Sequence, residues 1–598
     1  MYIQSILQAP LAHHDGSELY VDDAQPNLGD VVHVTVRISD ELHVNSVYVR
    51  TVIDGEPKYA QANITQTTQS ESLWTASIII HNTLTTYRFL LITAYGNLWL
   101  NGKGLHTADI TDAHDFRLST FHIPNWTRDA IIYQIFPDRF AKSDAHPITD
   151  YPQWAIPTEW DAPVAAHTEN AVRQMYGGSI WGITEHLEYI KNLGANVIYM
   201  TPFFPAQSNH RYDASTFNHV DPSLGGDRAL KALTEKAHSL GIRVIGDLTL
   251  NHSGVTHEWF LTGKDNQASP EAHFYYFNCD GHGGYATFDG VESMPKFDHR
   301  SSELQHRLYD GPDSVVARYI KDFGLDGWRI DVAQSAGIYC DINLNADIAE
   351  KTHATMENTA SDTLLIAEHQ FDASLTLQGS GWQGTMSYAA FTKPIWAWLG
   401  CNHPENEWGI PGPAARYGGN NMIHSMVEFM SSIPWQATVA SMNLLDSHDT
   451  SRFRTIAGPY QELGIALQMT LPGMPMIFSG DEVGIEGHGL EEARQPFPWD
   501  SSRWDHSIYD LYQTLITLRH NHSALRNGGL RWYHCTADSI IYERADHNET
   551  LLIEISKKQH TSLISSIDAT SLTDDVNLKK GMPMPSSGPS FHIWKIDN

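Results

Sequence analysis

Hydrophobic and polar residues alternate over the first 120 residues of the chain. Runs such as 31–36 (Val-Val-His-Val-Thr-Val) and 46–50 (Ser-Val-Tyr-Val-Arg) are separated by turn residues, which is typical of half-buried strands. Alternation returns near the end of the chain, for example at 551–555 (Leu-Leu-Ile-Glu-Ile). We therefore predict a β-sandwich domain over residues 1–120 and a second one over residues 526–598.

Residues 121–525 follow a different pattern, in which short continuous apolar runs alternate with amphipathic segments. Buried strands separated by helices predict a parallel α/β sheet, here closed as a (β/α)8 TIM barrel. The expected strands cover 130–135, 196–201, 243–250, 326–332, 364–368, 386–391, 441–446 and 474–479, and the main helices 182–193, 227–240, 314–323, 346–360, 462–471 and 507–521. Residues 252–301 are too many for a structureless loop, so we predict a small inserted subdomain after the third strand.

Candidate chemistry is sought where these strands end, because barrel enzymes place reactive groups at the C-terminal ends of their strands. The fourth strand contains Arg329 and Asp331. Side chains two residues apart on a strand share a face, and the nearby positive charge favours the ionised form of Asp331. An ionised carboxylate can serve as a covalent nucleophile. Taken alone, an Arg-x-Asp pair is more often a structural ion pair.

Other predicted strand ends add further ionisable residues, and that changes the interpretation. They are Asp247 and His252 from the third strand and its end, Glu368 and His369 from the end of the fifth, and His448 and Asp449 after the seventh. Burying so many ionisable groups at one end of the barrel would destabilise the fold, so a purely structural role does not explain them. A metal site is the alternative chemistry, although a guanidinium in its middle would repel a cation. Glu368 follows an apolar strand and has carboxylates nearby, and both effects raise the pKa of a carboxyl group.

These segments resemble the signature regions of family 13 glycoside hydrolases, the α-amylase family, at residues 247–252, 327–331, 368 and 448–449. The resemblance implies that Asp331 is the nucleophile, Glu368 the general acid/base and Asp449 the stabiliser of the transition state. It also implies retention of anomeric configuration, in which one carboxyl attacks and the other donates a proton. The implied substrate-binding residues are Asp247, His252, Arg329, His369 and His448.

A narrower resemblance connects the chain to neopullulanases, cyclomaltodextrinases and, most of all, maltodextrin glucosidases. It rests on residues 177–182, 294–298 and 473–484, and on a loop at 208–213 like the one that lines the glycone subsite in these enzymes. A tyrosine in that loop can stack on the apolar face of a sugar. The substrate-binding candidates therefore also include His210, Tyr212 and, from the segment 494–499, Arg494.

The expected activity is hydrolysis of α-1,4 bonds in short maltodextrins, as in maltodextrin glucosidases. A cyclomaltodextrinase, neopullulanase or maltogenic amylase with a wider cleft and transglycosylation is the alternative, and a non-catalytic glycan-binding relative is a remote one. Two departures from the family pattern affect this choice. Residues 333–335 read Ala-Gln-Ser where relatives often carry Asn or His and then Glu, and Leu490 replaces a common aspartate.

Composition limits the possible partners and cofactors. A formal charge of −31 argues against nucleic acid and anionic membranes as partners. The four cysteines are far apart, and the chain shows neither a signal peptide nor an apolar run long enough to span a membrane, so we expect a cytoplasmic protein. No organic cofactor is required. Many relatives bind calcium, but Lys142 in the loop 141–146 does not favour it. The resemblance also implies a homodimer through the N-terminal domain.

Overall fold

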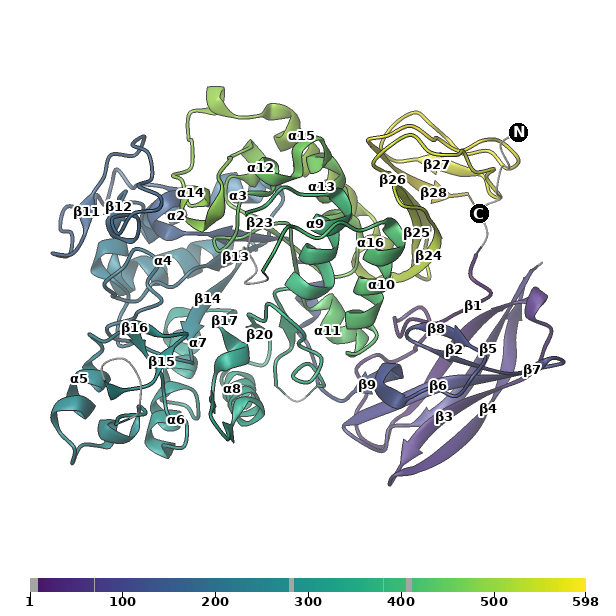
Figure 1. Ribbon diagram of the computed structural model, residues 1–598, viewed down its shortest axis with the longest axis horizontal. Helices are drawn as coiled ribbons and strands as arrows, with labels where there is room; N and C mark the ends of the chain where they lie inside the picture. Colours follow the sequence, from purple (N-terminus) through teal and green to yellow (C-terminus); the bar gives the residue numbers. More distant parts are fainter. Residues whose placement is uncertain (1–8, 69, 279–283, 380, 405–410, 598) are drawn as a thin grey trace.

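A computed structural model describes residues 9–68, 70–278, 284–379, 381–404 and 411–597. Figure 1 shows an antiparallel domain in purple, a central barrel in blue to green and a second antiparallel domain in yellow. The predicted fold class is confirmed. Within the described residues no helix is both long enough and apolar enough to cross a membrane.

The N-terminal domain is built from antiparallel strands in the order β1-β2-β5-β4-β3-β6-β7-β8, with β9 paired to β6. In β2 every second side chain is buried, which is the alternation seen in the sequence. These side chains form a core with aromatic residues of β6. The strands are β1 (Ala12–His13), β2 (Val31–Ser39), β3 (Val44–Ile53), β4 (Glu56–Thr67), β5 (Glu71–Ile79), β6 (Leu84–Thr93), β7 (Gly96–Asn101), β8 (Gly104–His106) and β9 (Phe116–Ser119).

The barrel contains eight parallel strands among the described residues, in the order β21-β20-β17-β14-β13-β10-β23-β22. A parallel bridge between Met386 and Met442 connects the two ends of this series and closes the ring. The strands are short and almost entirely buried, as expected for a sheet covered by helices. They are β10 (Ile132–Ile135), β13 (Val197–Met200), β14 (Arg243–Thr249), β17 (Gly327–Asp331), β20 (Leu364–Ala367), β21 (Gly384–Thr385), β22 (Met442–Leu444) and β23 (Met474–Phe478).

The sixth strand is not where the sequence pattern placed it. The predicted strand 386–391 is wrong beyond its first residue, because Tyr388–Thr392 forms a π-helix that continues into α9 (Lys393–Leu399). Tyr388 and Phe391 are buried in this helix. A short apolar run of this kind does not distinguish a buried strand from a buried helix turn.

Helices surround the barrel close to the predicted positions. The segment predicted as one helix at 182–193 is two, because the backbone turns at His186, whose ring bonds the carbonyl oxygen of Gly182 at 2.8 Å. Ser314 caps the helix before β17, accepting a hydrogen bond from Ala317 N–H at 3.3 Å. The longer helices are α2 (Ile180–Glu185), α3 (Leu187–Leu193), α4 (Gly226–Ser239), α7 (Val315–Phe323), α8 (Asn345–Thr359), α10 (Gly419–Met430), α13 (Gln461–Thr470) and α15 (His506–Asn521).

Residues between β14 and α7 form a separate layer at the side of the barrel. This segment contains α5 (Glu258–Asp265), the strand pair β15 (Thr287–Phe288) and β16 (Val291–Pro295), and α6 (Ser302–Leu308). Backbone hydrogen bonds join it to the end of β14, with Ser253 N–H donating to Pro295 O and Phe297 N–H to Asn251 O. Residues 279–283 of the predicted insertion lie outside the described residues.

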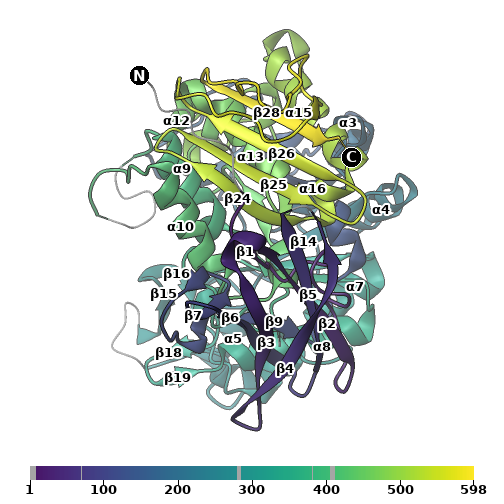
Figure 2. The same ribbon diagram turned by 90° about the vertical axis from the view of Figure 1, so that its right-hand side faces the viewer.

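The C-terminal domain is an antiparallel sheet in the order β24-β25-β26-β28-β27. Figure 2 shows this yellow sheet above the purple N-terminal domain, both on the same side of the barrel. Arg531 of β24 donates to Glu71 at 2.7 Å, which joins the two flanking domains directly. The strands are β24 (Gly529–Cys535), β25 (Ser539–Ala545), β26 (Thr550–Ser556), β27 (Ala569–Ser571) and β28 (Ser590–Ile596).

Candidate active site

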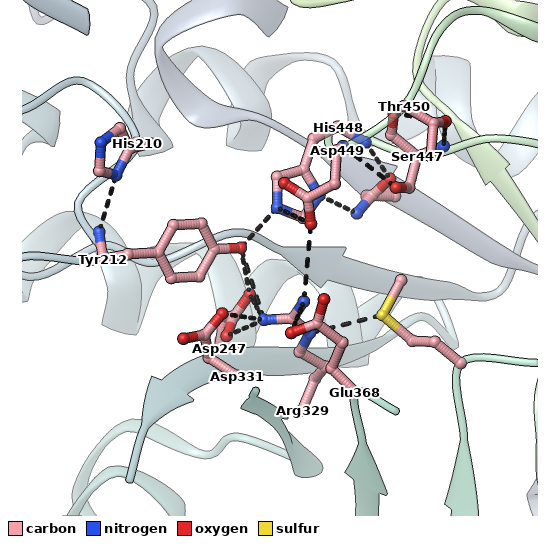
Figure 3. Close-up of polar contacts among 12 residues, drawn as sticks. His210, Tyr212, Asp247, Arg329, Asp331, Glu368, Ser447, His448, Asp449 and Thr450 are labelled. Carbon is pink, nitrogen blue, oxygen red and sulfur yellow. Dashed lines mark hydrogen bonds and ion pairs between the residues drawn. The ribbon is translucent and has the colours of Figure 1, made fainter. Parts of the chain in front are cut away.

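A fully buried guanidinium, that of Arg329, lies at the centre of the barrel mouth (Figure 3). Its Nη1 donates to Asp331 at 3.0 Å and to both oxygens of Asp247 at 3.0 and 3.1 Å. Its Nη2 lies 3.1 Å from Glu368 Oε2 and 3.9 Å from Asp449 Oδ2. One cation therefore contacts carboxylates from four different strand ends.

Strand register explains why these residues meet. In the parallel pairing of β14 with β17, Asp247 is aligned with Arg329 and Thr249 with Asp331. Side chains at i and i+2 on a strand share a face, so Asp247 and Asp331 both reach the side of the sheet that holds Arg329. Glu368 directly follows β20, which pairs with the other edge of β17.

The charge balance of the cluster differs from the expectation for an isolated Arg329–Asp331 pair. Burial and the neighbouring carboxylates raise the pKa of Asp331 above its ordinary value, although Arg329 opposes this. Burial likewise raises the pKa of Asp247 to about 6, and it raises the pKa of Glu368, with Asp449 adding to the effect. Because one guanidinium cannot neutralise four carboxylates, the cluster favours holding protons near neutral pH. Retaining hydrolysis needs one protonated and one ionised carboxyl.

A strained turn directly after Asp331 contributes to the site. Val332 has a left-handed backbone (φ 38°), which is rare for a β-branched residue. In this conformation its N–H donates to Glu368 Oε2 at 2.7 Å, while Ala333 N–H donates to the Glu368 carbonyl oxygen at 3.1 Å. Such strain persists only where the surroundings enforce it, and it is common at active sites. The turn therefore fixes the position of Glu368 relative to Asp331.

His448 belongs to a hydrogen-bonded chain that ends on Asp247. Gln134 Nε2 donates to His448 Nδ1 at 2.8 Å, which leaves the proton of a neutral ring on Nε2. The Tyr212 hydroxyl contacts that Nε2 and donates to Asp247 at 3.0 Å. Burial lowers the pKa of His448 well below its ordinary value, so the ring is neutral. The rings of Tyr212 and His448 are stacked, with centroids 5.7 Å apart.

His252 lies beside Asp331. Its Nε2 is 4.0 Å from Asp331 Oδ2 and has no hydrogen-bond partner among the described residues. The ring stacks on Phe288 of the inserted subdomain at 5.2 Å. Burial lowers the pKa of His252 to about 3. A neutral imidazole with a free ring nitrogen beside the carboxylate can bind a sugar hydroxyl.

Asp449 is the most solvent-accessible carboxylate of the cluster, with 26% of its side chain exposed. Arg494 Nη2 lies 3.2 Å from Asp449 Oδ1, and Arg494 Nε donates to the carbonyl oxygen of His448 at 2.7 Å. Arg494 itself is buried. Arg494 thus fixes the position of both the His448 main chain and the Asp449 side chain.

The remaining sequence candidates lie at different distances from this cluster. His210 accepts a hydrogen bond from Tyr212 N–H at 3.2 Å, and its ring lies 5.8 Å from that of Tyr212. His369 instead lines a neighbouring pocket together with Phe371 and Met426. The structure therefore brings the sequence-derived candidates together around Arg329 and Tyr212, with the exception of His369.

Tyr199, Gln134 and Val332 belong to the site and were not singled out from the sequence. The Tyr199 hydroxyl donates to Asp247 at 2.6 Å, and Gln134 fixes the tautomer of His448. Both side chains are fully buried on strands. A polar residue inside an otherwise apolar strand is a detectable signal, because its side chain must find a buried partner. The strain at Val332 leaves no such signal.

The loop at 141–146 does not offer a set of calcium ligands. Lys142 Nζ lies 5.6 Å from the centre of the Trp160 ring, and the His146 ring stacks on Trp181 at 4.1 Å. Calcium prefers six to eight oxygen ligands, and a lysine and a stacked histidine do not supply them. Within the part of the chain that the structure describes, no group of three or more His, Cys, Asp or Glu residues could hold a metal ion.

Comparison with known proteins agrees with this geometry. A family model described as the catalytic domain of alpha-amylase matches residues 134–528. A cyclomaltodextrinase from a Bacillus species is 30% identical over 458 residues, covering 74% of this chain and 76% of the relative. Neopullulanase 2 from Thermoactinomyces vulgaris is 30% identical over 481 residues, covering 76% of this chain and 74% of the relative. A solved structure of a cyclomaltodextrinase matches with a TM-score of 0.74 and 25% identity, covering 98% of this chain and 99% of the other. The chain therefore belongs to the α-amylase family of glycoside hydrolases, family 13, in the group of the cyclomaltodextrinases and neopullulanases.

Proposed function

We propose that this enzyme hydrolyses α-1,4-glucosidic bonds in cyclodextrins and short maltodextrins with retention of configuration. The observation that carries the proposal is the arrangement around Arg329, whose two terminal nitrogens contact Asp331 and Glu368 from neighbouring strands. A double displacement usually needs two carboxyl groups about 5–5.5 Å apart, and their contact with one shared guanidinium supports such a placement. An inverting mechanism needs a wider gap, of roughly 6.5–9.5 Å, to admit water.

In the proposed mechanism Asp331 attacks the anomeric carbon while protonated Glu368 donates its proton to the departing oxygen. A glycosyl ester forms on Asp331, and the leaving glucan departs as an alcohol. Ionised Glu368 then removes a proton from water, which attacks the anomeric carbon and releases Asp331. Burial raises the pKa of both carboxyl groups, so the cluster can hold the proton that Glu368 donates, and the Arg329 contact with Asp331 favours ionisation of the nucleophile. Asp449, near both Arg329 and Arg494, would stabilise the positive charge that develops on the sugar.

The neutral histidines and Tyr212 are proposed to bind the glucose unit on the glycone side. His252 lies beside Asp331 with a ring nitrogen that can bond a sugar hydroxyl, and His448 lies beside Asp449, where a sugar hydroxyl would take the place of Tyr212 on its Nε2. Tyr212 presents an aromatic ring beside them, suited to the apolar face of a sugar. The proposed reaction uses no organic cofactor and no metal ion.

The relatives support the cyclomaltodextrinase-type alternative better than the maltodextrin-glucosidase expectation drawn from the short motifs. Both the 30% identical relatives and the structural match belong to the cyclomaltodextrinase and neopullulanase group. We therefore place cyclodextrins and short linear maltodextrins first among the substrates. A glucosidase of the narrower kind would release glucose from maltotriose and leave β-cyclodextrin intact.

Two further properties are proposed with this function. A homodimer through the N-terminal domain is supported by apolar side chains exposed on neighbouring strands, those of Val31, Ile64 and Ile79. A reducing, cytoplasmic location is supported by Cys340, Cys401 and Cys535, which are free thiols.

Product analysis of the wild type, Asp331→Asn and Glu368→Gln on maltotriose and β-cyclodextrin tests the proposal. NMR of the first products should show the α-anomer from the wild type, and both variants should lose at least about 10³-fold in kcat. Asp326→Asn is the matched control, because Asp326 precedes the same strand and pairs with His238 and Arg243 away from the site. A β-anomeric product, or an Asp331→Asn enzyme with near-normal activity, would refute the mechanism.

A further inference from the structure

Lys296 is a buried lysine beside the candidate site that the proposed reaction does not use. It directly follows β16 in the inserted subdomain and is 6% exposed. Its Nζ donates to the carbonyl oxygen of Ser335 at 2.9 Å and also to the side-chain oxygen of Asn251. Among the residues that the structure describes, no carboxylate forms an ion pair with it. Both of its acceptors are neutral oxygens.

Such a position is unfavourable for an ammonium group, so the hydrogen bonds that the group donates are expected to have a function. Burying a charge without a partner of opposite charge destabilises a fold by several kcal/mol. Burial accordingly lowers the pKa of Lys296 to about 8. A methionine would fill the same space without this penalty, so filling space does not explain the lysine. Its hydrogen-bond donors do, because an N–H of an ammonium group forms stronger hydrogen bonds to carbonyl oxygens than a neutral donor does.

The two acceptors lie on segments that carry candidate catalytic groups. Ser335 ends the short turn η8 (Ala333–Ser335), which directly follows Asp331 and the strained Val332. Asn251 immediately precedes His252, and the backbone of Lys296 is bridged to that of His252. Figure 1 shows β15 and β16 beside the end of β14. One ammonium group therefore links the inserted subdomain, the His252 segment and the turn after the nucleophile.

The turn needs such support because Val332 is in an unfavourable conformation. From one side Asn345 Nδ2 donates to the carbonyl oxygens of Ala333 and Ala336, at 2.6 and 3.0 Å. Lys296 donates to a further carbonyl oxygen of the same turn, that of Ser335. If the turn relaxed, the Val332 N–H would move away from Glu368 and Asp331 would lose its fixed direction.

We propose that Lys296 is a positioning residue, which holds the turn after Asp331 so that the nucleophile and the Glu368-binding N–H of Val332 keep their reactive geometry. The proposal rests on the roles of Asp331 and Glu368 given above. Lys296 touches neither carboxylate in the described contacts and acts through the turn. The inserted subdomain thereby takes part in catalysis.

The test compares Lys296→Met and Lys296→Arg with Lys557→Met as the matched control. Lys557 is also buried and donates to a main-chain oxygen, that of Trp398, but it lies in the C-terminal domain. We expect Lys296→Met to lower kcat on maltotriose by about 10- to 100-fold with KM within about threefold, because the lost bonds support the transition state. Lys296→Arg should recover most of kcat, and Lys557→Met should leave kcat unchanged.

A second substrate separates positioning from proton donation. On α-maltosyl fluoride, whose leaving group needs little protonation, Lys296→Met should keep most of its defect because Asp331 itself is displaced. If Lys296→Met does not fold, Asn345→Ala loosens the same turn from the other side and should show the same selective loss of kcat. A wild-type kcat in a folded Lys296→Met enzyme, or an equal loss in Lys557→Met, would overturn the proposal. An active Asp331→Asn enzyme would instead overturn the proposed function on which it rests.

Discussion

Replacing Arg329 by methionine is the most direct perturbation of the carboxylate cluster. Methionine fills a similar volume but removes the cation that contacts Asp247, Asp331 and Glu368 at 3.0–3.1 Å. The Arg329 side chain is completely buried, so water cannot enter to solvate the carboxylates in its place. The carboxyl groups can respond by taking up protons, which removes the ionised nucleophile.

The size of the effect follows from these distances. A single ion pair at 3 Å amounts to about 5 kcal/mol at an effective dielectric constant near 20, and breaking a buried pair typically costs about 3–5 kcal/mol. A change of about 4 kcal/mol corresponds to about 3 pKa units. The pKa of Asp331 is already raised in the wild type, so the substitution moves it further in the same direction. We therefore expect a loss of about 10³-fold in kcat/KM near neutral pH.

The assay is the pH profile of kcat/KM on maltotriose for the wild type, Arg329→Met and Arg329→Lys. The acid limb reports the nucleophile and should move to higher pH by about 2–3 units in Arg329→Met. Arg329→Lys retains the charge but cannot contact all the oxygens, so its loss should be smaller. Because the substitution raises carboxyl pKa values in the folded state, its destabilisation should be smaller at pH 5 than at pH 7. An unshifted acid limb, or an activity within tenfold of wild type, would refute the electrostatic argument.

Two other outcomes follow from the structure. Tyr212→Phe removes the hydroxyl between Asp247 and His448, and we expect kcat/KM on maltotriose to fall by about 10- to 30-fold, with Tyr199 still bonded to Asp247; a change below twofold would remove the hydroxyl from the mechanism. Burial lowers the pKa of His14 to about 4, so the folded protein excludes a proton that the unfolded histidine binds below pH 6.5. The neutral His14 contributes up to about 3 kcal/mol to the free energy of unfolding. This contribution is complete above pH 6.5 and is lost as the pH falls towards 4. Denaturant unfolding should show that the free energy of unfolding falls less steeply between pH 7 and pH 4.5 in His14→Gln than in the wild type. Equal pH dependence in the two proteins would contradict this assignment.

Much of the fold could be predicted from local sequence patterns. The alternation in residues 31–36 is a consequence of side chains pointing to opposite faces of a strand, and the structure buries every second residue of β2. Apolar runs predicted β17 and α7 nearly to the residue, at 326–332 and 314–323. The sixth barrel strand was misplaced because a short apolar run carries no information on whether it is extended or helical.

The candidate catalytic residues could also be named from the sequence, because the position of a residue at a strand end already limits its role in a barrel. Arg329, Asp331, Glu368 and Asp449 were identified in this way, and the structure places them in one cluster. His369 shows the limit of this reasoning. It is adjacent to Glu368 in the chain, but its side chain lines another pocket, since consecutive residues point in different directions.

Only the tertiary structure decided how charge is shared. Sequence reasoning paired Asp331 with Arg329 alone, whereas the register of β14 against β17 also places Asp247 on the same guanidinium. The pairing of strands, the strain at Val332 and the reach of Lys296 to Ser335 join residues tens of positions apart. Protonation depends on the distances and burial of all these groups together, and a linear pattern contains neither. The sequence by itself therefore identified the charged residues at the strand ends, because their position in a barrel already limits their role. The folded packing added Tyr199, Gln134 and the strained Val332, excluded His369, and set the surroundings on which protonation depends.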